Sequence, residues 1–555
     1  MKKHYLKLTL IALLAINFSS CDNFFNPSTD VILDAKDYIK EDNEMYAGFL
    51  GIITKVQKIG DKSIYITDTR AEMLEPTPRA SNELFELYNY AEDLYLTRNS
   101  YADPAEYYDV IISCNDYLSR LQAYKESHLY SINMPHYRQL MSGAIRIKAW
   151  VYLTLAKIYG EAIWFDDPMN EKKNISDFSV YELKDLISAC KKLLKEGVDG
   201  VDGSYSFLPY MSGPESAPGF WVSYTVPTSS GETGIYVDWN YMAPEYFVLW
   251  SEICLWNSLF SDNPQEDYQE VIDNILPAIN NYIAARPQTG GNVPHWLQST
   301  QLWGQGNFLA TRTGQSDRQR ITILTYDSRY NQTNKLHKHF GNNFNTNLLV
   351  PSEVSVERLE DPVFTSLPVG TLDPRRSRVY ALSGSSPYVY KYGNGNLPRQ
   401  DHHIFIYRGI DLYFMLVEAL NHLGRYDEAW ALINNGVTSN QNFGWEGFSS
   451  DWSGSNRCAG VRGRAGLSAY YRPFKRSTDG VSDENTKYND MQILKETIIE
   501  FAVEGKTLPA MVRMALRYND PDIIADLVCP KYGDRAEEIR TKIHAGGYFI
   551  KWKLK

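Results

Sequence analysis

The sequence predicts an all-α protein in which helices pack in pairs, in the manner of tetratricopeptide repeats, with long loops and minor β-hairpins between the pairs. Three observations support this prediction. Apolar residues recur with helical spacing along much of the chain, and residues 418–429 have the pattern of two helices joined by a tight turn. Long segments rich in Gly, Asn and aromatic residues separate the helical ones.

The helical segments are each long enough for several turns, and apolar residues line one side of each. They are residues 37–56, 105–124, 137–159, 244–261, 266–285, 408–423, 427–435 and 491–516. Gly160 directly follows the third segment, at the position where a glycine commonly ends a helix. Trp150, Trp250 and Trp256 lie within these segments, and we expect them in the core.

The clearest helical pair is the segment 418–429. Gly424 permits a tight exit from the first helix, and Asp427 is a candidate cap for the second. Ala419 and Ala429 allow the two helices to approach closely. No regular 34-residue period runs along the chain, so we expect degenerate units rather than a regular solenoid.

Long segments of another character lie between the helices: residues 204–234, 287–314, 331–347 and 436–466. In and after the first of them, residues 220–226 and 235–237 are typical of a β-hairpin. Loops of this length are uncommon in compact domains unless they are functional.

Composition excludes several classes of protein. The chain has 555 residues, of which 43% are hydrophobic and 22% charged, so it is neither disordered nor a polytopic membrane protein. The net charge is −11, and residues 1–20 hold three lysines and no acid, so the remainder carries −11 − 3 = −14. A protein with this negative charge repels the phosphates of nucleic acid, so we do not expect nucleic acid as a partner. Aromatic residues make up 13%, which suits helix packing and also stacking on sugars or peptides.

The N-terminus is typical of an export signal. A basic start is followed by a short apolar run, about half of the ~20 residues that a membrane-spanning helix needs. Phe18-Ser19-Ser20 then precedes Cys21, which resembles a bacterial lipoprotein signal in residues 1–20 with Cys21 acylated. The alternative is an ordinary secretory signal. We expect residues 21–555 to form a single domain, with an N-terminal helical part to about 290 and a loop-rich and C-terminal helical part from about 291.

The remaining cysteines do not predict a redox or metal function. They are Cys114, Cys190, Cys254, Cys458 and Cys529. Their number is odd, they are far apart, and none forms a Cys-x-x-Cys pair, so a disulfide framework or a zinc site is not expected. Cys114 and Cys254 lie in apolar helical runs and are expected to be small buried residues.

Several short motifs, taken in order, resemble the SusD/RagB family of surface lipoproteins from Bacteroidetes nutrient-uptake systems. Beside Cys21, they are Tyr-Ala-Gly-Phe at 46–49, Ser-Cys-Asn at 113–115, the Ala-Arg-aromatic helix 144–160, Asp-Pro-Arg-Arg at 373–376, Lys-Tyr at 391–392, Tyr-Arg at 407–408, Val-Arg-Gly-Arg-Ala-Gly at 461–466 and Glu-Phe-Ala-Val-Glu-Gly-Lys at 500–506. The set spans residues 21 to about 515.

The chain also departs from this family's pattern. The family commonly has Glu where Ile410 or Asp411 stands, and Arg where Lys506 stands. The tail after Gly546 is short. These differences indicate a divergent branch, so the ligand of starch-binding members is not transferred to this chain.

The resemblance implies a helical scaffold with a loop-rich binding face, and a role in binding rather than catalysis, without a cofactor. It implies a lipid-anchored protein at the cell surface of the outer membrane. Its partner would be a TonB-dependent SusC-like transporter, over which it sits as a lid. The cargo would be an oligosaccharide, or a peptide as in RagB-like members. The remaining alternative is a helical scaffold for surface-protein assembly that binds no ligand.

In the family, ligand contacts come partly from the stretch before the first Cys-Asn helix and partly from loops in the middle of the chain. Here those regions offer Tyr88, Tyr90, Trp296 and Trp303, which we predict as ligand-binding residues. The alternative for each is packing against a helix or the transporter. Trp221 and Trp239 are weaker candidates, because an aromatic residue in a hairpin usually serves its own cross-strand pair.

A search for catalytic motifs gives no enzyme class. The sequence has no Gly-x-Ser-x-Gly, no His-Glu-x-x-His and no Walker loop. The histidine pairs His402-His403 and His337-x-His339 lack the spacing for one helix face, so we predict no metal site. The 67 acids could supply a carboxylate pair for glycoside hydrolysis, but no pattern selects one. We therefore predict that the chain is not an enzyme.

Overall fold

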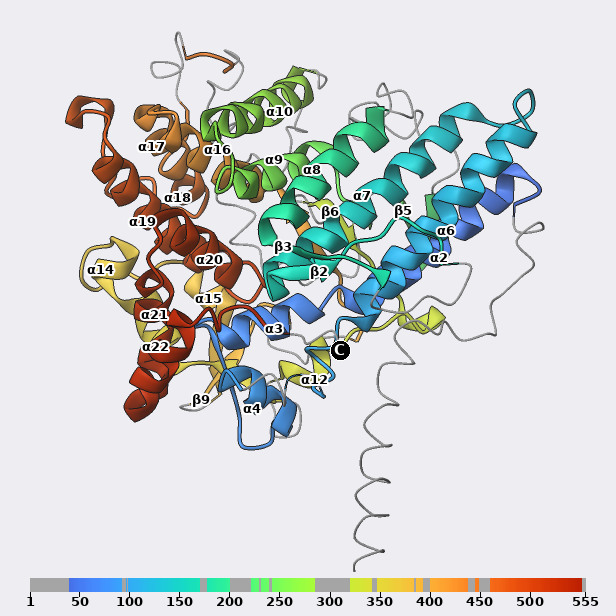
Figure 1. The fold of residues 1–555 in the computed structure, drawn as a ribbon. Coiled ribbons are helices and arrows are strands. Elements are labelled where there is room, and N and C mark those ends of the chain that lie inside the picture. The colour runs from blue at the N-terminus through green and yellow to red at the C-terminus, as the bar shows by residue number, and fades with distance from the viewer. Residues whose placement is uncertain are drawn as a thin grey trace, which may run out of the picture.

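The computed structural model shows a largely helical protein (Figure 1). It describes residues 39–91, 96, 98–169, 177–199, 221–228, 231–238, 242–284, 320–341, 347–383, 386–392, 400–437, 445–448 and 460–551. The predicted fold class is confirmed, since long helices packed in pairs form the body of the molecule.

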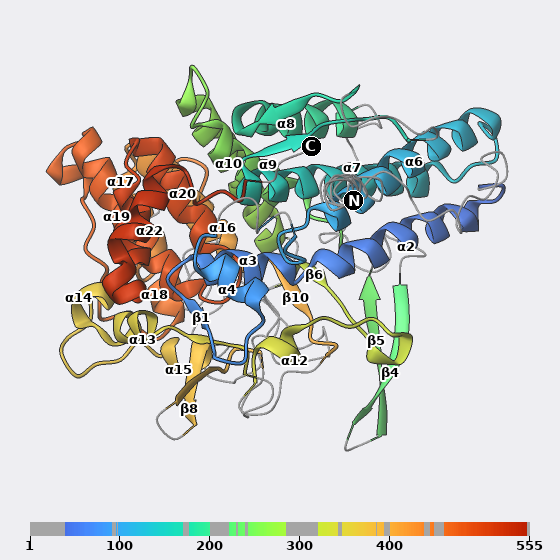
Figure 2. The same ribbon diagram turned by 60° about the horizontal axis from the view of Figure 1, so that its bottom comes forward.

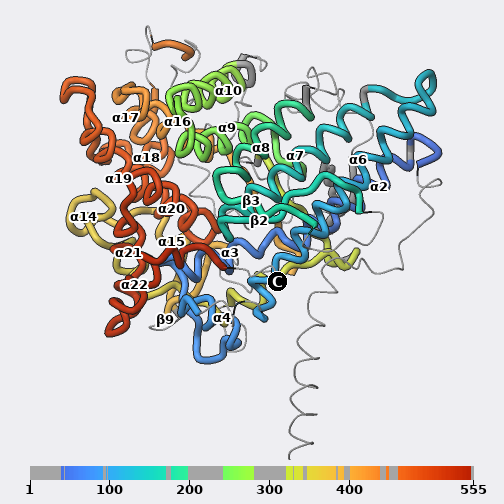
Figure 3. The backbone as a smooth tube through the Cα atoms, viewed as in Figure 1, coloured from blue at the N-terminus to red at the C-terminus, as the bar shows by residue number. Residues whose placement is uncertain are grey.

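Among the described residues, six long helices lie in the N-terminal half. They are α2 (Asp42–Ile59), α6 (Ala105–Ser127), α7 (Met134–Tyr159), α8 (Leu183–Asp199), α9 (Tyr246–Asn257) and α10 (Pro264–Ala284). Each of the first four packs against the next, as neighbouring tubes in Figure 3, and α9 pairs with α10. Gly160 ends α7 with a φ of 72°, so the predicted glycine stop is confirmed. The helix α8 was not among the predicted segments.

The C-terminal half contributes α16 (Gly409–His422), α17 (Tyr426–Ile433), α19 (Asp483–Glu500), α20 (Thr507–Tyr518), α21 (Asp522–Val528) and α22 (Ala536–His544). The pair α16–α17 confirms the predicted hairpin, with Gly424 in the left-handed region at φ 72°. The predicted cap is wrong. Arg425 is the N-cap of α17, and Asp427 instead lies in its first turn and pairs with Arg476.

The predicted helix 491–516 is two helices, α19 and α20, separated at residues 501–506. Val503 and Gly505 both have positive φ there, at 60° and 74°. A Cβ on Gly505 would lie 3.0 Å from backbone atoms of Ser63 and Ile64, so the break lets this turn approach α3 (Lys62–Arg70) closely. Gly505 N donates to Asp68 Oδ2 at 2.8 Å.

The strands form antiparallel pairs, and most lie on the side opposite α8 (Figure 2). The pairs are β1 (Leu74–Pro76) with β7 (Leu349–Pro351), β2 (Glu161–Ile163) with β3 (Val180–Glu182), β4 (Trp221–Thr228) with β5 (Gly231–Asp238), β6 (Arg320–Leu324) with β10 (Ile404–Arg408), and β8 (Tyr380–Ser383) with β9 (Ser386–Val389). The pair β4–β5 confirms the predicted hairpin, with Tyr224 opposite Ile235.

Short helices complete the loop-rich side: α4 (Asn82–Tyr88), α12 (Leu336–His339), α13 (Glu353–Glu360), α14 (Pro362–Thr365), α15 (Arg376–Val379) and α18 (Val461–Arg464), with 3-10 turns η7 (Ser328–Tyr330), η9 (Ser477–Asp479) and η10 (Cys529–Arg535). The core confirms the expected tryptophans, because Trp150, Trp250 and Trp256 are each at most 6% exposed. Cys114 and Cys254 are buried free thiols, also as expected.

The end of the described chain returns to the N-terminal helices. Ile550 N donates to Ile158 O at 2.9 Å, and the Arg70 guanidinium donates to Gly547 O. The C-terminal segment therefore closes the fold against α3 and α7. Among the described helices, none combines the length and the apolar character that crossing a membrane requires.

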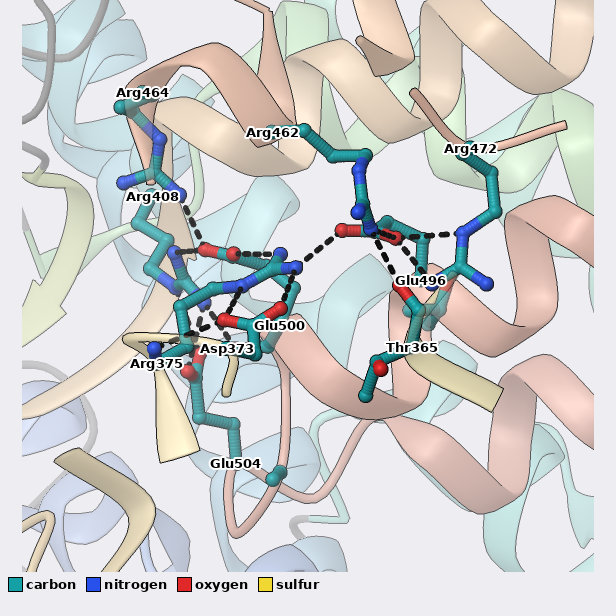
Figure 4. Close-up of polar contacts among 12 residues, drawn as sticks. Thr365, Asp373, Arg375, Arg408, Arg462, Arg464, Arg472, Glu496, Glu500 and Glu504 are labelled. Atoms are coloured by element: carbon teal, nitrogen blue, oxygen red, sulfur yellow. Dashed lines mark hydrogen bonds and ion pairs between the residues drawn. The ribbon is translucent and has the colours of Figure 1, made fainter. Parts of the chain in front are cut away.

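A buried ion network joins α19 to the segments packed around it (Figure 4). Three of its acids, Glu496, Glu500 and Glu504, are spaced four residues apart along α19 and the turn that follows, and a fourth, Asp373, pairs with Arg375. Its five arginines are each at most 1% exposed: Arg375, Arg408, Arg462, Arg464 and Arg472. They come from the N-cap of α15, the end of β10, α18 and the segment after α18, so the network ties four stretches of chain to one helix.

Glu500 is the centre of this network. It accepts from Arg375 Nη1 at 3.0 Å, Arg408 Nη1 at 2.8 Å and Arg464 Nη2 at 2.5 Å. The other two acids are also multiply bonded: Glu496 by Arg375, Arg462 and Arg472, and Glu504 by Arg408 and Lys391. Charge-assisted pairs of this kind compensate the cost of burying the ions only when every partner is present.

The network predicts a loss of stability in acid. Burial raises the pKa of Glu504, but Arg408 and Lys391 outweigh burial and bring it to about 2. A carboxyl whose pKa falls on folding contributes stability that is complete above its unfolded pKa of about 4.5 and is lost as the pH falls toward 2. Between neutral pH and about pH 3, we expect the urea midpoint to fall more in the wild type than in Glu504→Gln. Equal falls would contradict this assignment.

Candidate ligand-binding face

The stretch before α6, in which ligand contacts were expected, packs against a later segment of the chain, whereas the expected middle segment at residues 296–303 lies outside the described residues. The stretch before α6 and the middle of the chain pair through β1 and β7, with Leu74 opposite Pro351. Thr77 Oγ1 also donates to Asn347 O at 2.7 Å. Residues 82–91, 98–103 and 335–341 form what we name the α4–α12 face, whose second segment contacts α4 through Asn99 and α12 through Tyr101.

Tyr101 is an aromatic side chain on this face that lies half-buried, and its backbone is held by Asn99. Asn99 Oδ1 accepts from Tyr101 N at 3.0 Å, in a local turn. Asn99 Nδ2 donates to Glu83 O at 2.7 Å, which fixes this turn beside the first turn of α4. Lys335 Nζ lies 5.7 Å from the centre of the Tyr101 ring.

His339 fixes the direction of the Tyr101 hydroxyl. The two groups are 2.8 Å apart, and His339 Nδ1 lies 2.8 Å from Lys335 O. Burial lowers the pKa of His339 to about 4, so the ring is neutral at pH 7. Its Nδ1–H therefore donates to the carbonyl, and its Nε2 accepts from Tyr101. Tyr65 stacks on the same ring at 3.9 Å, so His339 is a positioning residue within the core.

Tyr88, a predicted ligand-binding residue, is half-buried at the end of α4. One part of its ring packs on Tyr532, with ring centres 4.7 Å apart, and its hydroxyl donates to Lys531 O at 3.2 Å. The Lys531 ammonium lies 4.8 Å from the ring, and burial lowers the pKa of this lysine to about 7. The Tyr88 side chain is thus held in one orientation by η10.

Tyr90, also predicted as a ligand-binding residue, lies in the core with 4% of its surface exposed. Its hydroxyl donates to Arg70 O at 2.5 Å, and the Arg70 guanidinium lies 4.2 Å from its ring centre. The structure places Tyr88 and Tyr90 beside the same residue, Tyr532, but only Tyr88 keeps exposed surface. For Tyr90 the contacts are those of the packing alternative.

Trp296 and Trp303, the other two predicted ligand-binding residues, lie outside the described residues, as do Cys21 and Trp239. Trp221 begins β4, in the predicted hairpin. For the four residues outside the described part of the chain, the structure therefore neither supports nor contradicts a place at the α4–α12 face.

Tyr101 was not singled out by sequence reasoning, although a signal was present. Asn99 stands two residues before it and Pro104 three residues after it, directly before α6, so a turn could be expected there. The position of His339 could not be read from the sequence, because its contacts with Tyr65 and Tyr101 join residues more than 200 positions apart.

The chemistry of the face suits binding. Tyr88 and Tyr101 offer partly exposed rings, and exposed Lys335 with Glu83 offers a donor and acceptors beside them. In the part of the chain that the structure describes, no group of three or more His, Cys, Asp or Glu side chains is placed to hold a metal ion.

Comparisons with known proteins give fold relatives only. No protein-family model matches the chain, and no curated protein matches it. Among solved structures, a SusD superfamily protein from Bacteroides vulgatus is 13% identical, with a TM-score of 0.58 and coverage of 92% of this chain and 95% of that one. A SusD homolog from Bacteroides thetaiotaomicron is 16% identical, with a TM-score of 0.57 and coverage of 92% and 94%.

A third structure is described as a SusD-like carbohydrate-binding protein from Bacteroides fragilis. It is 11% identical, with a TM-score of 0.55, and the match covers 86% of this chain and 87% of that one. The chain therefore has the fold of SusD superfamily proteins over nearly its whole length.

Proposed function

From the premise of this shared fold, we propose that the chain is a SusD-like surface lipoprotein that binds an oligosaccharide and performs no catalysis. The observation that carries the proposal is the match to SusD-like structures over about nine-tenths of the chain, one of them described as carbohydrate-binding. The α4–α12 face supports it, because tyrosine rings beside hydrogen-bonding side chains suit the apolar faces and hydroxyls of sugars.

We further propose Tyr88, Trp296 and Trp303, with Tyr101, as residues that contact the cargo. Tyr88 and Tyr101 lie near opposite ends of α4, a helix of seven residues whose ends are about 10 Å apart. That separation suits a short oligosaccharide rather than a single sugar. Tyr90 would act beneath the face, by holding Arg70 against α4.

Location and partner belong to the same proposal. Acylation of Cys21 would anchor the protein in the outer membrane at the cell surface, and a TonB-dependent SusC-like transporter would receive the cargo. Mass spectrometry of the mature protein from membranes checks the anchor: we expect an acylated N-terminal Cys21. Co-purification of the full-length protein with a TonB-dependent barrel tests the partner.

The experiment that tests the function is calorimetric titration of residues 22–555 with plant, host and fungal oligosaccharides and with a mixed peptide pool. Saturable binding of one oligosaccharide supports the proposal. Binding of peptides alone would assign the chain to the RagB-like alternative. Absence of binding to every ligand would favour the assembly-scaffold alternative.

The site assignment makes a separate prediction. We expect Tyr88→Ala, Tyr101→Ala and Trp303→Ala each to weaken oligosaccharide binding by about 1–3 kcal/mol, because each removes a stacking surface. Calorimetry measures the loss, and circular dichroism checks that the fold is intact. Tyr130→Ala, at a fully exposed tyrosine after α6, is the matched control and should bind normally. Normal binding by all three variants would contradict the assignment even if the function is right.

A further inference from the structure

A partly open cavity of about 110 Å³ lies where the N-terminal and C-terminal helices meet. Its walls come from α7 and α9, from α16, α19 and α20, and from β10 and the turn between α19 and α20. In the middle of these elements, α16 packs against both α9 and α19 (Figure 1). We name it the α7–α20 cavity. A single water needs a cavity of only about 10–15 Å³, so this space suits a molecule of the size of a sugar ring.

Three ion pairs line this cavity, and each joins two different elements: Lys157–Glu252, Asp411–Lys506 and Glu418–Arg513. Lys157 Nζ lies 2.8 Å from Glu252 Oε1, and Lys506 Nζ lies 2.6 Å from Asp411 Oδ1. The six side chains are between 3% and 21% exposed. Three cations and three anions balance, so the wall has no net charge and favours a neutral occupant.

The paired groups also fix donors and acceptors. An ionised carboxylate accepts at several lone-pair positions, and an ammonium carries three donors, so a pair retains capacity toward a third group. Because each pair bridges two elements, these groups are held in place before a ligand arrives, which lowers the entropy cost of binding. Hydroxyl groups, which both donate and accept, match such a wall.

Aromatic rings supply an apolar wall beside the ion pairs. Trp150, Tyr407, Phe414 and Phe501 line the cavity, and the Phe414 and Phe501 rings lie 5.1 Å apart. Lys506 Nζ is 4.8 Å from the Phe501 ring, so the charged and aromatic parts adjoin. Rings next to fixed hydrogen-bonding groups suit a molecule with hydroxyls on its edges and C–H groups on its faces.

We propose that the α7–α20 cavity binds a small neutral polyol of monosaccharide size, separately from the α4–α12 face. The two sites share no residue. The proposal stands whether or not the α4–α12 face binds an oligosaccharide, and each can fail without the other.

The test uses saturation-transfer NMR of residues 22–555 with D-glucose, D-galactose, D-mannose and N-acetylglucosamine, and with glucuronate and glucosamine as charged comparisons. We expect saturation transfer to at least one neutral sugar, with a Kd at least tenfold lower than for either charged sugar. Absence of transfer to all four neutral sugars, or tighter binding of a charged one, would overturn the proposal.

A variant that fills the cavity localises the binding. Ala510 lines the cavity on α20 and is partly exposed, so Ala510→Leu adds bulk with little strain on the core. We expect it to weaken monosaccharide binding at least tenfold. Ala536→Leu, at a partly buried alanine on α22 away from the cavity, is the matched control and should bind as the wild type does. If circular dichroism shows that Ala510→Leu is unfolded, Ala510→Val replaces it.

The same variants separate the two proposals. Unchanged monosaccharide binding by the folded Ala510 variant would overturn the cavity site. Loss of monosaccharide binding in this variant, with oligosaccharide binding unchanged, would support two independent sites. Loss of both would mean that one site serves both ligands, which would overturn the separate cavity site.

Discussion

Replacing Glu500 by glutamine is expected to lower the free energy of unfolding by about 3–5 kcal/mol. The carboxylate accepts from Arg375, Arg408 and Arg464, and all four side chains are at most 1% exposed. An amide cannot compensate three guanidinium charges that are buried to this degree. Glutamine keeps the size of the side chain, so the change is in charge and hydrogen bonding rather than in packing.

Urea unfolding followed by circular dichroism measures this loss. The control is Glu196→Gln on α8, whose side chain is 67% exposed and which lies 4.0 Å from its partner Lys192. We expect no measurable change there, because a pair exposed on both sides contributes little. A Glu500→Gln midpoint equal to that of the wild type would mean that the network is not needed for stability.

Gly460→Ala is the second substitution with a large expected effect. A Cβ on Gly460 would lie 2.5 Å from Asn434 O and 2.7 Å from Gly436 N, and backbone atoms cannot move aside as a flexible side chain can. Gly460 is the N-cap of α18, which carries Arg462 and Arg464 into the network. We expect a loss of about 1–3 kcal/mol or more, because the clash also displaces these two arginines.

Gly51→Ala provides the control with the same chemical change. Gly51 is an exposed residue within α2, and a Cβ there would meet no atom within 4 Å. Alanine is the better helix former, so we expect the free energy of unfolding, measured by urea unfolding, to rise by about 0.5–1 kcal/mol. Similar midpoints for the two alanine variants would show that the backbone contacts at Gly460 can relax.

The fold was predictable where local pattern and packing agree. The spacing of apolar residues predicted α2, α6, α7 and the pairs α9–α10 and α16–α17, since a long amphipathic segment has one stable way to bury its apolar side. The prediction failed at residues 501–506, where the helical pattern continues but the chain turns. That turn depends on Gly505 meeting α3 from more than 400 residues earlier, and no local signal contains such a contact.

The candidate site was less predictable, and the ion network explains why. The motifs that resemble the SusD/RagB family include Arg375, Arg408, Glu500 and Glu504, which meet in the network rather than at the α4–α12 face. These motifs therefore describe the scaffold. Asp411 and Lys506 stand at positions where the chain departs from the family pattern. Their side chains contact each other at 2.6 Å in the wall of the α7–α20 cavity.

Binding residues carry no such signature, because a stacking ring needs only to be exposed at the right place. Tyr88 and Tyr90 are two positions apart and chemically identical, yet one is half-buried and the other lies in the core. The difference arises from η10 and Arg70, which pack against this segment from distant parts of the chain.

The return of the C-terminal segment to the first helices has a consequence for how the chain acquires its structure. Arg70 donates to Gly547 O, 477 residues later, and Thr507 Oγ1 donates to Asp68 Oδ1 across a separation of 439 residues. At a synthesis rate of about 5–20 residues per second, Arg70 is made roughly 25–95 s before its partner. The N-terminal helices therefore cannot complete their core while the chain is being made. Contacts of such separation also slow folding after release. During that interval the parts of α3 and α7 that the C-terminal segment covers remain exposed, and a chaperone that holds unfolded chains has a binding target until the last residues arrive.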